Sequence, residues 1–293
     1  MPDFSGYGPF SDRIISEGSE SMVCSPTKPV QFDSVRPLVR YVDEEQAVIE
    51  IHIALRRPLP VIGGPGWRFG PRLEVLVKLS CSDGFSDEQC APLRLRHGRS
   101  KVRLDVVHPR RWWPAGMGEQ PLYDLSVDLL LGGQRIDRWQ TTIGFTSVRP
   151  QGMPTDASGR PGPSRLLVTV NGQQCDIDAV VAIDRINENS LLPVAGDSLL
   201  LIRDHYGPDV LYEAADRAGI MLIQCVPIHP EGRPEVDVPA QVSRLAAHPS
   251  LAGWFIGHLG QVSRRIAHRL RRLDPSHCLM TDPQDPWVAT PPI

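Results

Sequence analysis

The chain has 293 residues, of which 41% are hydrophobic and 22% are charged, and its formal net charge is −3. These values are typical of a globular protein with one large domain or two ordinary ones. A slightly negative chain is a poor general binder of nucleic acid, and no apolar run is long enough to span a membrane. We therefore expect neither nucleic acid nor a membrane among its partners.

The N-terminal stretch, residues 1–30, is rich in Ser, Gly and Pro and shows no sustained hydrophobic period. This composition predicts a flexible N-terminal arm. The stretch has no basic segment followed by an apolar core. We therefore expect no secretory signal and a cytoplasmic location.

Six cysteines are scattered along the chain without a C-x-x-C pair. This spacing does not suit metal ligation, so we expect no metal ion and no cofactor. Cys81 and Cys90 flank a short polar stretch and could form a bridge across a hairpin. Without an export signal, two reduced thiols are the favoured interpretation.

An all-β pattern follows the arm. Apolar and polar residues alternate along 46–55, 72–81 and 101–107. Gly132-Gly133 separates two further alternating runs, which is typical of a β-hairpin. At least six short strands predict an immunoglobulin-like β-sandwich over residues 31–149, although the usual immunoglobulin disulfide pattern is not evident.

The pattern changes after a Pro- and Gly-rich stretch, residues 150–165, which we interpret as a linker. Short apolar runs such as SLLLIRD, IMLIQCVP and AGWFIGH are typical of parallel strands covered on both faces. Helical patterns separate most of them and predict a βα array, although the first crossover lacks a clear helix. The last helix places its arginines opposite an apolar face, where a solvated outer surface is favoured over a nucleic-acid role.

The segment that begins WWPAGMGEQPLYDL resembles glycoside hydrolase family 2, which contains β-galactosidases, β-mannosidases and β-glucuronidases. The positions that match the family segment are Trp113, Pro114, Gly116, Gly118, Gln120, Pro121, Leu122 and Tyr123. Gly144, Phe145 and Arg149 match the family's exit from the sandwich more loosely. In that family the sandwich leads into a TIM barrel.

The resemblance continues through VTVNGQQ, IRDHYGPDVLYEAADRAGIMLI, HPSLAGWFIGHLG and RLDPSHCLMTD, and it covers roughly residues 30–285. It implies that VTVNGQQ corresponds to the strand before the first barrel strand, and that the other three segments correspond to the second to fifth strand units of the barrel. The chain ends soon after the fifth. We therefore expect a truncated TIM-barrel-like domain of about five strands over residues 166–293.

The family's acid/base is a Glu that closes the motif G-N-E after strand four. In this chain Gly257 matches the Gly, His258 takes the Asn position and Leu259 takes the Glu position. Leu259 cannot transfer a proton. The family's nucleophile follows strand seven, for which we expect no counterpart. The resemblance thus implies a degenerate site with no catalytic residue.

Other polar residues follow the expected strands. They are Asp184, Asp204, His205, Tyr206, His229, His258 and Asp282. A carboxylate pair among them could in principle support hydrolysis, but polar rim residues without a catalytic role are favoured. The family's corresponding His lies beside the substrate, so His205 is the best candidate for residual sugar contact. Asp204, Tyr206, His258 and Asp282 are the others.

Trp112 and Trp113 could stack on a sugar ring, and Trp254 could point into the barrel or onto a helix. We instead expect Trp112 and Trp113 to pack between domains and Trp254 to lie in the core. Two functions remain open for the chain. One is a non-catalytic structural, interaction or carbohydrate-binding module, and the other is a diverged β-glycosidase. An incomplete barrel would also need a cover over its inner face, from the sandwich, the terminal segments or a second chain, so a homo-oligomer is expected among the partners.

Overall fold

A computed structural model describes residues 30–56, 72–150, 166–177, 179–183, 198–228, 237–256 and 261–280. The expected flexible arm and linker fall almost entirely outside these ranges. Several expected site residues also lie outside the described part. These are Asp184, His229, Gly257, His258, Leu259 and Asp282.

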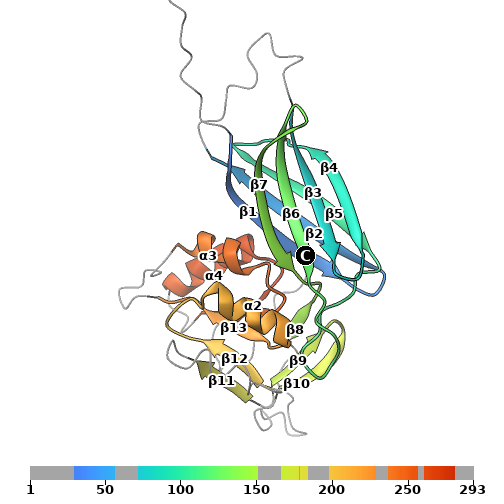
Figure 1. The fold of residues 1–293 in the computed structure, drawn as a ribbon. Coiled ribbons are helices and arrows are strands. Elements are labelled where there is room, and N and C mark those ends of the chain that lie inside the picture. The colour runs from blue at the N-terminus through green and yellow to red at the C-terminus, as the bar shows by residue number, and fades with distance from the viewer. Residues whose placement is uncertain are drawn as a thin grey trace, which may run out of the picture.

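Seven strands form two antiparallel sheets that pack as a sandwich (Figure 1). Their bounds are β1 (Phe32–Val42), β2 (Gln46–Leu55), β3 (Leu73–Cys81), β4 (Ser86–Pro92), β5 (Arg99–Val107), β6 (Tyr123–Leu131) and β7 (Gln134–Ile143). One sheet has the order β1-β2-β5 and the other has the order β4-β3-β6-β7. The strands predicted from alternation are confirmed.

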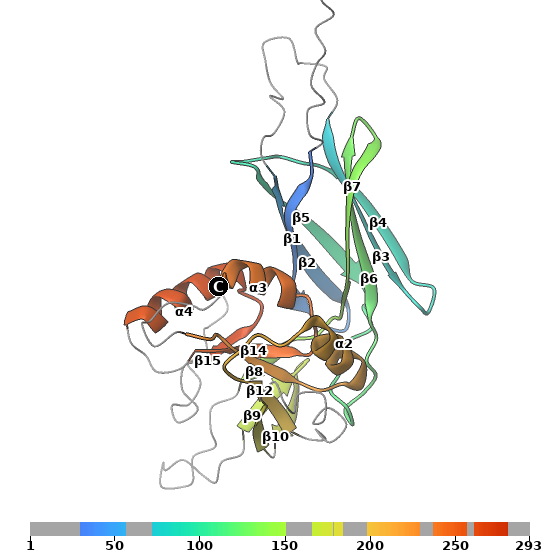
Figure 2. The same ribbon diagram turned by 60° about the vertical axis from the view of Figure 1, so that its left-hand side comes forward.

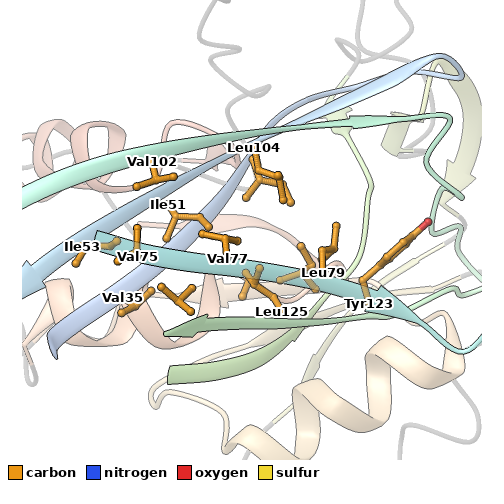
Figure 3. Close-up of a cluster of buried hydrophobic side chains, with 14 of the residues drawn as sticks. Val35, Ile51, Ile53, Val75, Val77, Leu79, Val102, Leu104, Tyr123 and Leu125 are labelled. Atoms are coloured by element: carbon orange, nitrogen blue, oxygen red, sulfur yellow. The ribbon is translucent and has the colours of Figure 1, made fainter. Parts of the chain in front are cut away.

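The alternation places every second side chain in the space between the sheets. Along β2 the buried side chains include Ile49, Ile51 and Ile53, and they meet Val75 and Val77 of β3 in one cluster (Figure 3). Burial of each large aliphatic side chain contributes about 1.5–3 kcal/mol. This cluster therefore holds the two sheets together.

The predicted hairpin joins β6 and β7 through Gly132 (φ 60°) and Gly133 (φ 82°). Positive φ at both central residues is the requirement of a type I′ turn, which explains the Gly-Gly pair. The possible Cys81–Cys90 bridge does not form. The register of β3 and β4 places Cys90 opposite Leu76, and both thiols are free.

A small antiparallel sheet follows, with the order β10-β9-β8. Its strands are β8 (Val148–Pro150), β9 (Leu166–Val170) and β10 (Gln173–Ile177). Asn171 and Gly172 form the two-residue turn between β9 and β10, again with positive φ at both positions.

Five parallel strands then pair in chain order, β11-β12-β13-β14-β15. They are β11 (Ala179–Ile183), β12 (Ser198–Ile202), β13 (Leu222–Cys225), β14 (Leu251–Phe255) and β15 (Cys278–Met280). Three described helices connect them, α2 (Asp209–Ala218), α3 (Val238–Leu245) and α4 (Gln261–Leu273). The βα alternation predicted from the sequence is thus confirmed. Even α4, the longest described helix, is too short to cross a bilayer.

The helices cover one face of the parallel sheet. Leu211 of α2, Val242 of α3 and Leu270 of α4 share a buried cluster with Leu200 and Leu222 of the strands. Figures 1 and 2 show these helices beside the sheet, below the sandwich.

The opposite face of the sheet carries a separate cluster. Leu199, Ile223 and Ala252 pack there against Val168 of β9 and against Trp112. The expected cover of the inner face therefore comes in part from the sandwich domain, through Trp112. Val168, Val170 and Ile177 of the β9–β10 hairpin pack on this face as well, and this hairpin was not among the covers that the sequence suggested.

The sandwich and the parallel sheet are joined at the segment between β5 and β6. The Trp112 side chain is fully buried, and its indole N–H donates to the carbonyl oxygen of Asp216 in α2 at 2.8 Å. The Ala115 amide donates to the carbonyl oxygen of Gly219 at 2.9 Å. The predicted packing role of Trp112 is confirmed, and Trp254 is also buried in the core.

Candidate functional site

The carboxyl ends of the five parallel strands meet at one edge of the sheet, where the following loops present their side chains. At this edge β12 ends at Ile202, and residues 203–208 form the turn that enters α2. This turn contains Asp204, His205 and Tyr206, the described members of the predicted sugar-binding set. It is therefore the part of the site that can be built from contacts.

Gln224 of β13 holds this turn in place. Its side-chain carbonyl accepts hydrogen bonds from the Gly207 amide at 3.2 Å and from the Tyr212 hydroxyl at 2.7 Å. Its amide group donates to the carbonyl oxygens of His205 at 2.8 Å and Cys225 at 2.6 Å. Gln224 is fully buried, and all of its hydrogen-bonding groups are used. The turn therefore has a defined conformation.

His205 and Tyr206 are largely enclosed by the protein. The His205 ring is buried, and its Nδ1 donates to the carbonyl oxygen of Arg203 at 2.7 Å. Tyr206 packs against the helix-side core, and burial raises the pKa of its phenol. Its hydroxyl is buried and has no hydrogen-bond partner among the residues that the structure describes. A ligand would have to reach these two groups from the edge of the sheet.

Asp204 is the exposed member of the three. It adopts a left-handed backbone conformation (φ 61°), which is uncommon for a residue other than Gly. Its negative charge lies close enough to Cys225 to affect the pKa of that thiol. Burial, the larger cause, and the negative charge of Asp204 together raise the pKa of the Cys225 thiol to about 11. Cys225 is thus a neutral thiol at neutral pH and a poor nucleophile.

Sequence reasoning missed Gln224 and Cys225. Both stand inside or at the end of the apolar run IMLIQCVP, where periodicity indicates only a strand. A polar Gln within such a run is itself a signal, because a buried amide requires partners. Its partners lie in another strand–helix unit and cannot be read from the run alone.

The end of β14 is where the family resemblance places the acid/base. Phe255, its last residue, is paired with Cys225 at the same edge. The sequence contains no acidic residue between Phe255 and Asp274, which follows α4. Asp274 is buried, and its carboxylate accepts hydrogen bonds from the Trp254 indole and from His277, both at 2.8 Å. Its hydrogen bonds fix α4 and β15 relative to β14.

The opposite edge of the sheet carries a second buried polar group. The Asp216 carboxylate lies 2.7 Å from Nδ1 of His248 and accepts a hydrogen bond from the Ser250 amide at 3.0 Å. His248 and Ser250 precede β14, at the amino ends of the strands, and their buried contacts with Asp216 join α2 to this segment. The motif His248-Pro249-Ser250 is therefore structural.

No group of three His, Cys, Asp or Glu side chains suited to a metal ion occurs among the residues that the structure describes. The described edge offers the exposed carboxylate of Asp204, the neutral thiol of Cys225 and the phenol of Tyr206. Two other carboxylates, Asp209 and Asp237, begin helices at this edge, and Asp209 is engaged by Arg244. This set suits hydrogen bonding to a polar ligand better than proton transfer.

The fold and this edge place the chain among proteins that join a β-sandwich to a parallel βα sheet. The family model "Glycosyl hydrolases family 2" matches residues 74–145. The chain is therefore related to glycosyl hydrolases family 2, which confirms the resemblance seen in its sequence.

Two curated relatives illustrate the similarity. An exo-β-D-glucosaminidase of Streptomyces avermitilis is 28% identical over 181 residues, which is 53% of this chain and 19% of the relative. A β-mannosidase B of Thermothelomyces thermophilus is 25% identical over 259 residues, which is 81% of this chain and 30% of the relative. The chain thus spans less than a third of the length of either relative.

Solved structures share the fold. The β-D-mannosidase from Dictyoglomus thermophilum matches with a TM-score of 0.65 and 21% identity, over 87% of this chain and 35% of that one. An exo-chitosanase of Amycolatopsis orientalis matches with a TM-score of 0.61 and 18% identity, over 87% of this chain and 32% of that one.

Proposed function

We propose that this chain is a catalytically inactive relative of family 2 glycosidases that serves as a structural, interaction or carbohydrate-binding module. A single observation carries the proposal: the carboxyl end of β14 is followed by no acidic side chain until the buried Asp274. The names of the relatives, a β-mannosidase and an exo-β-D-glucosaminidase, support carbohydrate as the ligand class.

Retaining glycosidases need two carboxyl groups about 5–5.5 Å apart, one as nucleophile and one as acid/base. General acid catalysis alone accelerates a reaction by about 10²–10⁴-fold. With Leu259 at the position of the acid, that acceleration is lost, and no neighbour along the chain replaces it. The exposed Asp204 carboxylate and the Tyr206 hydroxyl can hydrogen-bond a sugar, which supports binding without turnover.

We also infer the finer architecture from the strand orders. Sheets of three and four antiparallel strands in the orders β1-β2-β5 and β4-β3-β6-β7 suit a sandwich of immunoglobulin type. Five parallel strands paired in chain order, with helices on one face, suit the first part of a TIM barrel. In the described part of the chain β11 and β15 have one strand neighbour each. We propose that a second copy or another chain pairs with one of these edges.

The activity test compares three forms of the full chain on a panel of aryl β-glycosides. They are the wild type, Asp204→Asn and Asp282→Asn, with Asp124→Asn on the exposed side of β6 as the matched control. We expect no turnover above the buffer blank from any of them. Turnover by wild type and control that disappears in either site variant would show an active, diverged glycosidase.

That diverged β-glycosidase is the second candidate function, and the exposed Asp204 at the sheet edge is the observation that favours it.

A binding experiment distinguishes a carbohydrate-binding module from a purely structural one. Titration calorimetry with neutral β-linked oligosaccharides should give heat with wild type and Asp124→Asn, and less with Asp204→Asn. No heat with any oligosaccharide would leave the structural or interaction role.

A further inference from the structure

Helix α4 has an unusual outer surface. Ile266, Ala267 and Leu270 are buried against the parallel sheet. The opposite surface carries six exposed basic side chains within nine residues. They are Arg264, Arg265, His268, Arg269, Arg271 and Arg272, which we call the arginine face. The helix contributes five positive charges to a chain whose net charge is −3, and it contains no acidic residue.

The stability of the helix accounts for only part of this composition, because Arg271 and Arg272 alone stand in the last turn, where the helix dipole favours a cation. Arg265 and Arg269 are four residues apart and Arg269 and Arg272 three, so like charges face each other and disfavour the helix. Arg264 stands in the first turn, where the helix dipole disfavours a cation. No arginine of this face forms an ion pair with another described residue. By contrast, Arg217 of α2 pairs with Glu213, four residues away.

We propose that the arginine face of α4 is a binding site for an anionic polysaccharide, one that carries sulfate or carboxylate groups. Guanidinium groups bind such oxyanions through paired, charge-assisted hydrogen bonds. The helix is about 20 Å long at 1.5 Å per residue and presents its cations along that length. It begins at the sheet edge that carries the candidate sugar site, so one glycan chain could follow both.

The choice of a polysaccharide rests on the proposed carbohydrate-related function, and two observations weigh against nucleic acid. Helix α4 has no aromatic side chain on which a base could stack, the usual device for single strands. The net negative charge of the chain opposes a duplex, whose phosphates would extend well beyond one helix. A flexible glycan needs no stacking platform and can confine its anionic groups to the arginine face.

The test uses the full chain and three probes at matched ionic strength: heparin as a sulfated glycan, polygalacturonate as a carboxylated glycan, and duplex DNA. Neutral dextran reports background. The test variant is Arg265→Gln with Arg269→Gln and Arg272→Gln. The matched control is Arg94→Gln with Arg96→Gln and Arg99→Gln, which removes three exposed positive charges from the sandwich. Glutamine is a good helix former, so the test variant should fold.

We expect wild type and control to bind heparin or polygalacturonate more tightly than DNA. The α4 variant should bind about tenfold or more weakly, with a salt slope smaller by roughly one unit per lost contact. Equal losses in both triple variants, preferential binding of DNA, or no binding of either glycan at low salt would overturn the proposal. Calorimetry of the α4 variant with neutral oligosaccharides tests the proposed carbohydrate binding at the sheet edge separately. Heat of binding equal to that of wild type would support that function whatever the result with the anionic glycans.

Discussion

Gln224 is the residue on which the turn after β12 depends. Its four hydrogen bonds tie His205 and Gly207 to β13 and reach Tyr212 on α2. Each of these partners is enclosed by protein, so water cannot replace the amide if it is removed. The candidate site therefore depends on a fully buried residue whose side chain faces α2.

Replacing Gln224 with Leu should lower the free energy of unfolding by about 3 kcal/mol, because it leaves several buried polar groups without partners. Urea denaturation measures the loss. Gln140→Leu, on the exposed part of β7, is the matched control and should change stability by less than about 0.5 kcal/mol. Similar losses for the two variants would contradict the role given to Gln224.

For single residues of the candidate site, the sequence predicted which side chains lie near the end of a strand. It predicted little about which of them are exposed and which are buried. Asp204, His205 and Tyr206 were expected at a strand end, and they lie there. That Asp204 is exposed while His205 is buried depends on a backbone with positive φ and on Gln224, which lies nineteen residues beyond His205. Local patterns cannot contain this information, because the contacts that decide it come from the next βα unit.

At the scale of elements, Asp274 joins α4, β14 and β15. Burial is the largest single effect on the Asp274 carboxyl and raises its pKa. The charge and hydrogen bond of His277, with hydrogen bonds from Trp254 and the Ser276 amide, together lower the pKa by more than burial raises it, so the net shift is downward. Arg36 of β1 also faces this carboxylate and interacts with its charge. The ionised form of Asp274 therefore stabilises the fold.

A pKa below the unfolded value gives a stabilisation that is complete above about pH 4 and is lost as the pH falls through the folded-state pKa. We expect Asp274→Asn to be destabilised relative to wild type at about pH 6, and the difference to shrink towards about pH 2. Urea denaturation across this range gives the comparison. A constant difference would contradict the assignment. Asp124→Asn should show little difference at any pH.

Strands and turns were predicted best where the local order of apolar, polar and glycine residues determines the structure. Alternation located the strands of the sandwich, and the Gly132-Gly133 pair located its hairpin. The β10-β9-β8 sheet as a cover of the inner face was not foreseen. Its strand β8 has three residues and pairs with a segment beyond residue 165, so no local period marks it.

For the whole molecule, the contact between Ala115 and Gly219 decides how closely the sandwich approaches α2. Gly219 ends α2 with φ 72°, and a Cβ atom there would lie 2.5 Å from the Ala115 nitrogen. Gly133 has a similar φ of 82° but no atom within 4 Å of the position of a Cβ. The two glycines share a backbone conformation and differ in their surroundings.

Gly133→Ala should lower the free energy of unfolding by about 1 kcal/mol, which is the strain of an L-residue at positive φ. Gly219→Ala should cost about 3 kcal/mol or more, because the added methyl group also forces the sandwich away from α2. Thermal and urea unfolding of both variants give the comparison. Equal costs would show that the domain contact contributes nothing.

Strand β8 has a further consequence for the motion of the molecule. It precedes residues 151–165 in the chain, but its only described strand partner, β9, follows them. The parts of the chain before and after residues 151–165 are thus joined by the β8–β9 strand pairing as well as by the contacts of Trp112. These two parts therefore cannot reorient independently of each other, and their relative orientation does not depend on the length of residues 151–165. A protease nick within that stretch would leave two fragments that stay together until a denaturant separates them.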